Sequence, residues 1–180
     1  MTRVLLLCTA NQCRSPMAEV LLRARRPTFE VQSAGRLPGG APASATAVQV
    51  VAARGLDLSK HISQTATPDL VGQSDLILGM AREHVRDAVL LRPDVRGRAF
   101  SLKDLVRRGE AVGQRRGGQS LDSWLGLAGA DRTTNDLLGS SPADDVSDPI
   151  GQAPARYRAC ADELDDLLAR LTAVAFPSTP

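Results

Sequence analysis

Short apolar runs recur along the first hundred residues, and each is followed by a segment with polar and apolar positions at helical spacing. Residues 4–8 (VLLLC) and 75–80 (DLILGM) are apolar without alternation, which is typical of strands buried on both faces of a parallel sheet. Shorter runs at 29–33 and 98–101 predict two further strands. The alternation of strands and helices predicts an α/β domain with a parallel sheet.

The helical segments carry start and stop signals of their own. Ser15 and Pro16 suit an N-cap and a first helical position, and apolar residues recur from 17 to 24. Further helices are expected at 43–54, 81–91 and 102–108, and a long amphipathic helix at 153–173. Residues 37–42 form a loop rich in Gly and Pro.

The segment 109–145 breaks this pattern. It is rich in glycine and contains the only tryptophan of the chain, Trp124, in one short apolar stretch. We therefore expect a single domain over residues 1–180, with a flexible insertion or lid at about 109–145.

Composition narrows the classes of function. Apolar residues make up 43% of the chain and charged residues 23%, and the net charge is only +2. The arginine pairs at 25–26, 107–108 and 115–116 are not interleaved with aromatics, so they indicate solvated faces rather than a nucleic-acid site. The sequence favours neither nucleic acid nor membrane as a partner.

A cytoplasmic location is the expectation from the same data. The run at 4–8 is too short for a signal peptide, and no stretch of 18 apolar residues predicts a membrane span. Cys8, Cys13 and Cys160 are too few for a disulfide scaffold, and they fit a reducing compartment. Two histidines and three cysteines form no metal-ligand cluster in the sequence.

The segment CTANQCRS carries the chemistry. It follows a predicted strand and opens a predicted helix, so its backbone N–H groups and the helix N-terminus would surround an anion. Arg14 supplies a planar fork for two phosphate oxygens, and Cys8 supplies a thiolate placed to attack phosphorus. Taken alone, Cys-x5-Arg is a weak signal, because Cys8 could be a small core residue and Arg14 a surface charge.

The stretch VLLLCTANQCRSPMAE resembles the phosphate loop of the low-molecular-weight protein tyrosine phosphatases. Further landmarks follow in the family's order at 33–35 (SAG), 55–61 (GLDLSKH), 75–80 (DLILGM) and 148–149 (DP). The resemblance implies a three-layer αβα fold whose four-stranded parallel sheet has the order 2-1-3-4. It also implies hydrolysis of phosphomonoesters through a cysteinyl-phosphate, without a cofactor or metal. The expected partner is a phosphorylated protein, with phosphotyrosine as the default, or a small phosphomonoester.

By this resemblance Cys8 is the nucleophile, Arg14 grips the phosphate, and Asp148 is the general acid and then base. Asp144 and Asp145 are rivals for the last role that the sequence does not separate. The expected substrate-binding residues of the loop are Thr9, Ala10, Asn11, Gln12, Cys13 and Ser15.

Five residues in or near the loop would have supporting roles by the same resemblance. Asn11 would hold the loop shape, and Ser15 would donate to the Cys8 thiolate. Ser33 and His61 would belong to a network behind the loop, although a lone histidine is as often a surface or helix-end residue. Cys13 would protect Cys8 through a reversible disulfide, or is simply a small core residue.

The sequence departs from the family pattern at two positions. One lies in the phosphate loop, and the other is where a wall for the ring of the substrate would stand. Ala10 replaces a glycine usual in the family, and would strain the loop if that position needs positive φ. Ile150 follows Asp148-Pro149 where many members have an aromatic residue. The wall is then aliphatic, from Ile150 and Leu37, or Trp124 supplies it from the insertion, or the substrate is not phosphotyrosine.

Two other functions compete with hydrolysis. Arsenate reductases share the fold and nucleophile, but those that pass on a disulfide need further cysteines near the middle of the chain, and none lies between Cys13 and Cys160. A reductase resolved by an external small thiol would not need them. A non-catalytic phosphate-binding module would need neither the nucleophile Cys8 nor the acid Asp148. The sequence does not indicate an oligomeric state.

Overall fold

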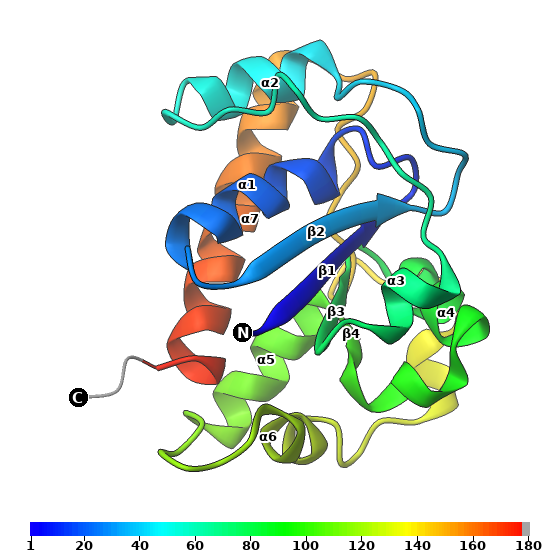
Figure 1. The fold of residues 1–180 in the computed structure, drawn as a ribbon, viewed down its shortest axis with the longest axis vertical. Helices are drawn as coiled ribbons and strands as arrows, with labels where there is room; N and C mark the ends of the chain where they lie inside the picture. Colours follow the sequence, from blue (N-terminus) through cyan, green and yellow to red (C-terminus); the bar gives the residue numbers. More distant parts are fainter. Residues whose placement is uncertain (178–180) are drawn as a thin grey trace.

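Four parallel strands form the centre of the computed structural model, which describes residues 1–177 (Figure 1). They are β1 (Arg3–Cys8), β2 (Glu30–Gly35), β3 (Leu76–Gly79) and β4 (Ala99–Ser101). Their order in the sheet is β2-β1-β3-β4, as predicted. Both neighbours of β1 run parallel to it, so the carboxyl ends of the strands share one edge, where α/β folds bind ligands.

Helices cover both faces of this sheet, which confirms the three-layer fold (Figure 1). They are α1 (Arg14–Arg25), α2 (Ala45–Ala52), α3 (Pro68–Gly72), α4 (Arg82–Leu91), α5 (Leu102–Val112), α6 (Leu121–Ala128) and α7 (Pro154–Ala175), with short 3-10 turns η1 (Pro93–Arg98) and η2 (Thr134–Leu137).

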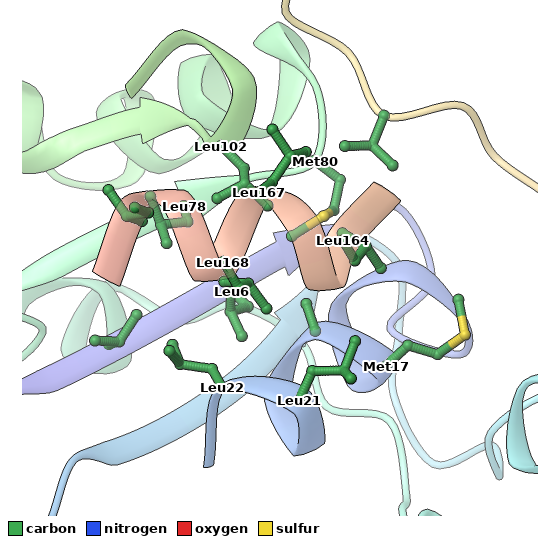
Figure 2. Close-up of a cluster of buried hydrophobic side chains, with 14 of the residues drawn as sticks. Leu6, Met17, Leu21, Leu22, Leu78, Met80, Leu102, Leu164, Leu167 and Leu168 are labelled. Carbon is green, nitrogen blue, oxygen red and sulfur yellow. The ribbon is translucent and has the colours of Figure 1, made fainter. Parts of the chain in front are cut away.

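Side chains of the central strands alternate between two apolar cores. Leu6 and Leu78 pack with α1, α5 and α7, as Figure 2 shows for the leucines and methionines of that cluster. Leu5 and Ile77 face the opposite way and pack with α3 and α4. Strands with apolar residues on both faces therefore fill both cores, as the unalternated runs predicted. Within residues 1–177, no helix has the length and apolarity that crossing a membrane requires.

The first helix begins earlier than the sequence predicted. Its N-cap is Cys13 and its first residue is Arg14, so Pro16 lies in the first turn rather than at the first position. Since the N–H groups of a first turn have no intrahelical partner, proline is tolerated there too. The shift matters because it places Arg14 itself on the helix, at the mouth of the loop after β1.

Residues 109–145, expected to form a flexible insertion or lid, contain the end of α5, helix α6 and the turn η2. Helix α6 packs against α5 and η1, far from the loop after β1 (Figure 1). Trp124 of α6 is 1% exposed, and its Nε1 donates to Gly113 O at 2.9 Å. A Cβ at Gly109 would lie 2.7 Å from the Trp124 ring, so this glycine forms the notch that the indole fills.

Arginine side chains bind carbonyl groups of both edge strands. Arg23 donates from Nε and Nη2 to Val31 O of β2, at 3.1 and 2.7 Å. Arg132 donates to Ala99 O of β4 at 2.8 Å, while its guanidinium lies 3.9 Å from the centre of the Phe100 ring. Each edge of the sheet thus has an acceptor occupied by a side chain of the same molecule.

Candidate active site

The loop between β1 and α1 carries the two residues that the sequence singled out. Cys8 is the last residue of β1 and Arg14 the first of α1, so both flank the carboxyl edge of the sheet. Gly35 pairs with Cys8 across the sheet. A Cβ at Gly35 would lie 2.8 Å from Thr9 O and 2.9 Å from Asn11 N. Only glycine therefore lets β2 support the loop backbone at this distance.

Asn11 fixes the shape of the loop. It is fully buried, and it is the one non-glycine residue with positive φ within residues 1–177, at 54°. Ala10 therefore does not require that conformation, and the strain expected there is absent. Asparagine tolerates the left-handed region, because its short side chain can hydrogen-bond locally. Its side-chain amide donates to Ser15 Oγ at 3.0 Å and to Ser33 Oγ at 2.7 Å.

Two segments behind the loop complete this network. The backbone N–H of Gln64 donates to Asn11 Oδ1 at 2.9 Å, and His61 Nε2 lies 2.8 Å from Asn11 O. Every polar group of the Asn11 side chain thus has a partner, as a buried amide requires. The structure places Ser33 and His61 behind the loop, each in contact with Asn11.

Cys8 lies at the base of the loop with its sulfur in contact with a donor. The side chain is buried, and Ser15 Oγ lies 2.9 Å from Cys8 Sγ. Because Asn11 donates to Ser15 Oγ, the hydroxyl proton of Ser15 is left to point at the sulfur. A hydroxyl donor on the sulfur suits a group that acts first as nucleophile and then as leaving group.

Arg14 is a buried cation with one group still open. Its Nη1 donates to Val146 O at 3.1 Å, and its Nη2 donates to Thr9 Oγ1 at 3.2 Å. The same Nη2 lies 2.5 Å from Asp148 Oδ2. Arg14 Nε is buried without a hydrogen-bond partner within residues 1–177. A buried N–H without an acceptor is costly, so this donor is suited to an incoming anion.

Asp148 reaches Arg14 from a loop held at both ends. Val146 N donates to Met80 O at 2.8 Å, which ties the loop to the end of β3. Beyond the acid, Ile150 N donates to Asp148 Oδ1 at 3.1 Å and Gln152 Nε2 donates to Asp148 O at 2.6 Å. The carboxyl group is about one third exposed, so it can reach both the loop and a bound substrate.

The two rival carboxylates have other partners. Asp144 is buried and forms ion pairs with Arg82 and Arg107, at 2.6 and 2.9 Å. Asp145 accepts from Arg82 N and from Ser141 N, both at 2.9 Å. Both anchor the segment that precedes the acid loop, while Asp148 is the carboxylate that contacts Arg14.

A Cys-x5-Arg loop on a β1–α1 turn, opposed by an aspartate, can be compared with known proteins. The family model of the low molecular weight phosphotyrosine protein phosphatases matches residues 3–113. A protein-arginine-phosphatase of Geobacillus stearothermophilus is 30% identical over 172 residues, which is 94% of this chain and 93% of that protein. The chain belongs to the low molecular weight phosphotyrosine protein phosphatase family. The predicted family and fold are thereby confirmed.

Other members of the phosphatase family show similarity of different extent. Etp of Escherichia coli K12, a low molecular weight protein-tyrosine-phosphatase, is 42% identical over 99 residues, 54% of this chain and 66% of Etp. The solved structure of a low molecular weight protein tyrosine phosphatase from T. tengcongensis matches with a TM-score of 0.70 and 31% identity. That match covers 95% of this chain and 97% of the other.

The residues beside the loop and the aspartate are aliphatic. Leu37 N donates to Thr9 O and Ile150 N donates to Asp148 Oδ1, both at 3.1 Å, and their side chains are 45% and 48% exposed at this rim. Trp124 lies in the core and does not form a wall. The other four aromatic residues of the chain also pack elsewhere, as buried or partly buried members of the main core. They are Phe29, Phe100, Tyr157 and Phe176. No aromatic side chain is therefore available at the rim.

The other two thiols differ from Cys8 in their surroundings. Burial raises the pKa of Cys13 far above its ordinary value, and burial raises that of Cys160 to about 12. Both belong to the same buried cluster as Cys8, and all three cysteines are free thiols. Neither Cys13 nor Cys160 is therefore ionised near neutral pH, so neither competes with Cys8 as a nucleophile.

His84 belongs to none of the sequence motifs, yet the structure brings it to the loop. His84 Nε2 lies 3.1 Å from Thr9 Oγ1, and the ring is 2% exposed. The residue follows β3 by five positions, on the first turns of α4. A histidine just after a buried strand at the carboxyl edge of the sheet was the available signal.

Proposed function

We propose that this chain hydrolyses phosphorylated protein side chains through a phosphoenzyme formed on Cys8. The observation that carries this is that a thiol, a cation and a carboxylate lie at the loop after β1. Ser15 Oγ contacts the Cys8 sulfur, Arg14 Nε has no hydrogen-bond partner within residues 1–177, and Asp148 lies against the same guanidinium. A site for binding alone needs neither a nucleophile nor an acid.

In the first step the substrate phosphoryl group enters the loop, and its oxygens accept from backbone N–H groups and from Arg14. The Cys8 thiolate attacks phosphorus in line with the leaving group, so an S–P bond forms as the P–O bond of a phosphoester, or the P–N bond of phosphoarginine, breaks. Asp148 gives its proton to the departing oxygen or nitrogen, which would otherwise leave as an anion. The product is cysteinyl-phosphate and the dephosphorylated side chain.

In the second step water attacks phosphorus from the side that the leaving group vacated. Asp148, now a carboxylate, takes a proton from that water as the S–P bond breaks. Ser15 donates to the sulfur that leaves, as its 2.9 Å contact with Cys8 Sγ allows. Inorganic phosphate and the free thiolate result, and Asp148 is again protonated for the next turnover.

Phosphotyrosine is the first candidate substrate, because Etp and the T. tengcongensis protein are named tyrosine phosphatases. Phosphoarginine is the second candidate. The relative named protein-arginine-phosphatase matches along nearly the whole chain, and the rim offers Ile150 and Leu37 rather than an aromatic wall. Aliphatic side chains cannot supply the ring stacking that favours phosphotyrosine. The alkyl chain of a phosphoarginine does not need a ring to pack against.

The test is hydrolysis of a chromogenic aryl phosphate by wild type and Cys8→Ser in parallel, with reductant and a chelator. We expect turnover by the wild type only, and inorganic phosphate still bound by Cys8→Ser. Turnover that survives in Cys8→Ser would contradict the phosphoenzyme. Two peptides of one sequence, bearing either phosphotyrosine or phosphoarginine, then separate the two substrates by their kcat/KM.

A further inference from the structure

A buried histidine is linked to the phosphate-gripping arginine through one hydroxyl group. Thr9 Oγ1 lies 3.2 Å from Arg14 Nη2 and 3.1 Å from His84 Nε2. The same Arg14 nitrogen contacts Asp148, so the Thr9 hydroxyl lies on the side of the loop where chemistry is proposed. The other ring nitrogen, His84 Nδ1, is buried without a partner within the described chain.

The hydroxyl of Thr9 has one proton and two lone pairs, and Arg14 occupies one lone pair because guanidinium nitrogens only donate. His84 either donates from Nε2 to the second lone pair or accepts the hydroxyl proton. In the accepting tautomer Nδ1 carries a proton that finds no acceptor in a buried place. Buried N–H groups without a partner are rarer than unpaired acceptors, so the donating tautomer is favoured.

The ring is also held in its neutral form. Burial, together with the nearby cations Arg14 and Arg36, lowers the pKa of His84 to about 3. A neutral ring with its proton on Nε2 leaves both lone pairs of Thr9 occupied. The Thr9 proton must then point away from both donors, and a phosphate oxygen held by Arg14 would be its acceptor.

We propose that His84 is a positioning residue of the active site, which holds Thr9 so that its oxygen fixes the Arg14 guanidinium and its proton meets the bound phosphate. The inference rests on the proposed function for its catalytic consequence, while its binding consequence stands without turnover. It also assigns Thr9 a hydrogen bond to phosphate from its side chain, in addition to that of the loop backbone.

The experiment is a cycle of four proteins: wild type, Thr9→Val, His84→Leu and the double variant. The readout is protection of Cys8 from iodoacetate by inorganic phosphate, which measures phosphate affinity without turnover. Alkylation reports on Cys8 because the pKa values of Cys13 and Cys160 are strongly raised. Thr172→Val is the matched control, since within the described residues the Thr172 hydroxyl donates to carbonyls of its own helix.

Each single variant should weaken phosphate binding by about 10- to 100-fold, the size of one net hydrogen bond to a charged group. The double variant should lose no more than Thr9→Val, because His84 acts through Thr9. His84→Gln keeps a side-chain N–H donor and should recover part of the affinity. Losses that simply add in the double variant, or phosphate affinity unchanged in His84→Leu, would overturn the proposal.

A spectroscopic readout covers the case in which His84→Leu does not fold. The chain has two histidines, so nitrogen-15 spectra of the wild-type rings with and without phosphate can be assigned by His61→Gln. The proposal expects a neutral His84 ring with its proton on Nε2, and a proton on Nδ1 overturns it. If the wild type binds phosphate in this way but hydrolyses nothing, the proposed function fails while the inference stands.

Discussion

Arg14 Nη2 and Asp148 Oδ2 lie 2.5 Å apart, so the proposed acid contacts the cation that must grip the substrate. A phosphate that binds both Nη2 and Nε of Arg14 has to displace this carboxylate. Asp148 also repels a phosphate dianion directly while it is ionised. The pair therefore couples entry of the phosphate to release of the acid.

Asp148→Asn should separate these two effects. We expect inorganic phosphate to inhibit the variant at about two- to fivefold lower concentration, since a partly exposed ion pair is worth up to about 1 kcal/mol. Aryl phosphate hydrolysis should slow by about 10²–10⁴-fold, because the leaving oxygen loses its proton donor. Steady-state kinetics with phosphate as competitor measures both, and weaker inhibition by phosphate would contradict the displacement.

Substitutions at Asn11 can separate the effect of its positive φ from the effect of its side-chain hydrogen bonds. Asn11→Gly keeps the positive φ of 54° and loses the side-chain bonds, while Asn11→Ala loses both. Both variants should bind phosphate more weakly than the wild type. Asn11→Ala should also unfold more easily than Asn11→Gly, by about 1 kcal/mol for a left-handed alanine. Urea titrations of the two variants give that difference, and a more stable Asn11→Ala would be inconsistent with the backbone seen here.

Gly35 is where β2 and the loop backbone touch. Gly35→Ala would set a Cβ 2.8 Å from Thr9 O, so the loop must move and phosphate affinity should fall by at least about tenfold. Gly126→Ala is the control, because a Cβ there meets nothing within 4 Å on an exposed face of α6. That control should keep its activity and gain up to about 1 kcal/mol of stability. If Gly35→Ala bound phosphate as tightly as the wild type, the loop backbone could move away from the added Cβ without cost to binding.

The sequence left open whether Trp124 or Ile150 forms the wall of the substrate site. Substitution of Trp124 should affect stability, and substitution of Ile150 should affect substrate preference. Trp124→Phe removes the bond to Gly113 O and part of a buried ring, so the free energy of unfolding should fall by about 1–3 kcal/mol with kcat/KM unchanged. Ile150→Ala, at an exposed rim position, should leave stability unchanged and alter kcat/KM between phosphotyrosine and phosphoarginine peptides. A change of substrate preference in Trp124→Phe would mean that the indole contributes to substrate binding.

His84 should make the protein sensitive to acid. Its pKa is about 3 in the fold against 6.5 ordinarily, because it is buried beside Arg14 and Arg36, with Glu83 also near. The unfolded chain therefore binds the extra proton first, and stability that is complete above pH 6.5 is lost as the pH falls toward 3.

At about 1.4 kcal/mol per pKa unit, this acid loss amounts to a few kcal/mol. Urea unfolding of wild type and His84→Gln at pH 7 and pH 4.5 gives the comparison. The variant should lose less stability over that interval, and an equal loss in both proteins would exclude His84 as the source.

The strand, loop and first helix were predictable from the sequence because their signals are local. An apolar run, Cys-x5-Arg and Ser15-Pro16 lie within fourteen residues of each other, and each constrains the same turn. The start of α1 was misplaced, since a hydroxyl and a proline suit more than one position of a first turn.

The features that the sequence did not predict depend on contacts between residues far apart in the chain. Trp124 fills a notch at Gly109, and nothing near either residue in the sequence announces that contact. His84 and Thr9 are 75 positions apart, and a histidine on an amphipathic helix ordinarily indicates a surface. Asp148 was separable from Asp144 and Asp145 only by family resemblance, because their different ion pairs exist only in the folded chain.

Arg23 and Arg132, which bind carbonyls of the two outer strands, have a consequence for the protein at high concentration. A bare strand edge is a template on which another chain can add a strand, the first event of β-mediated aggregation. Here Val31 O and Ala99 O are already occupied. Removing either arginine would expose an edge acceptor without touching the phosphate loop, and should increase self-association of the chain.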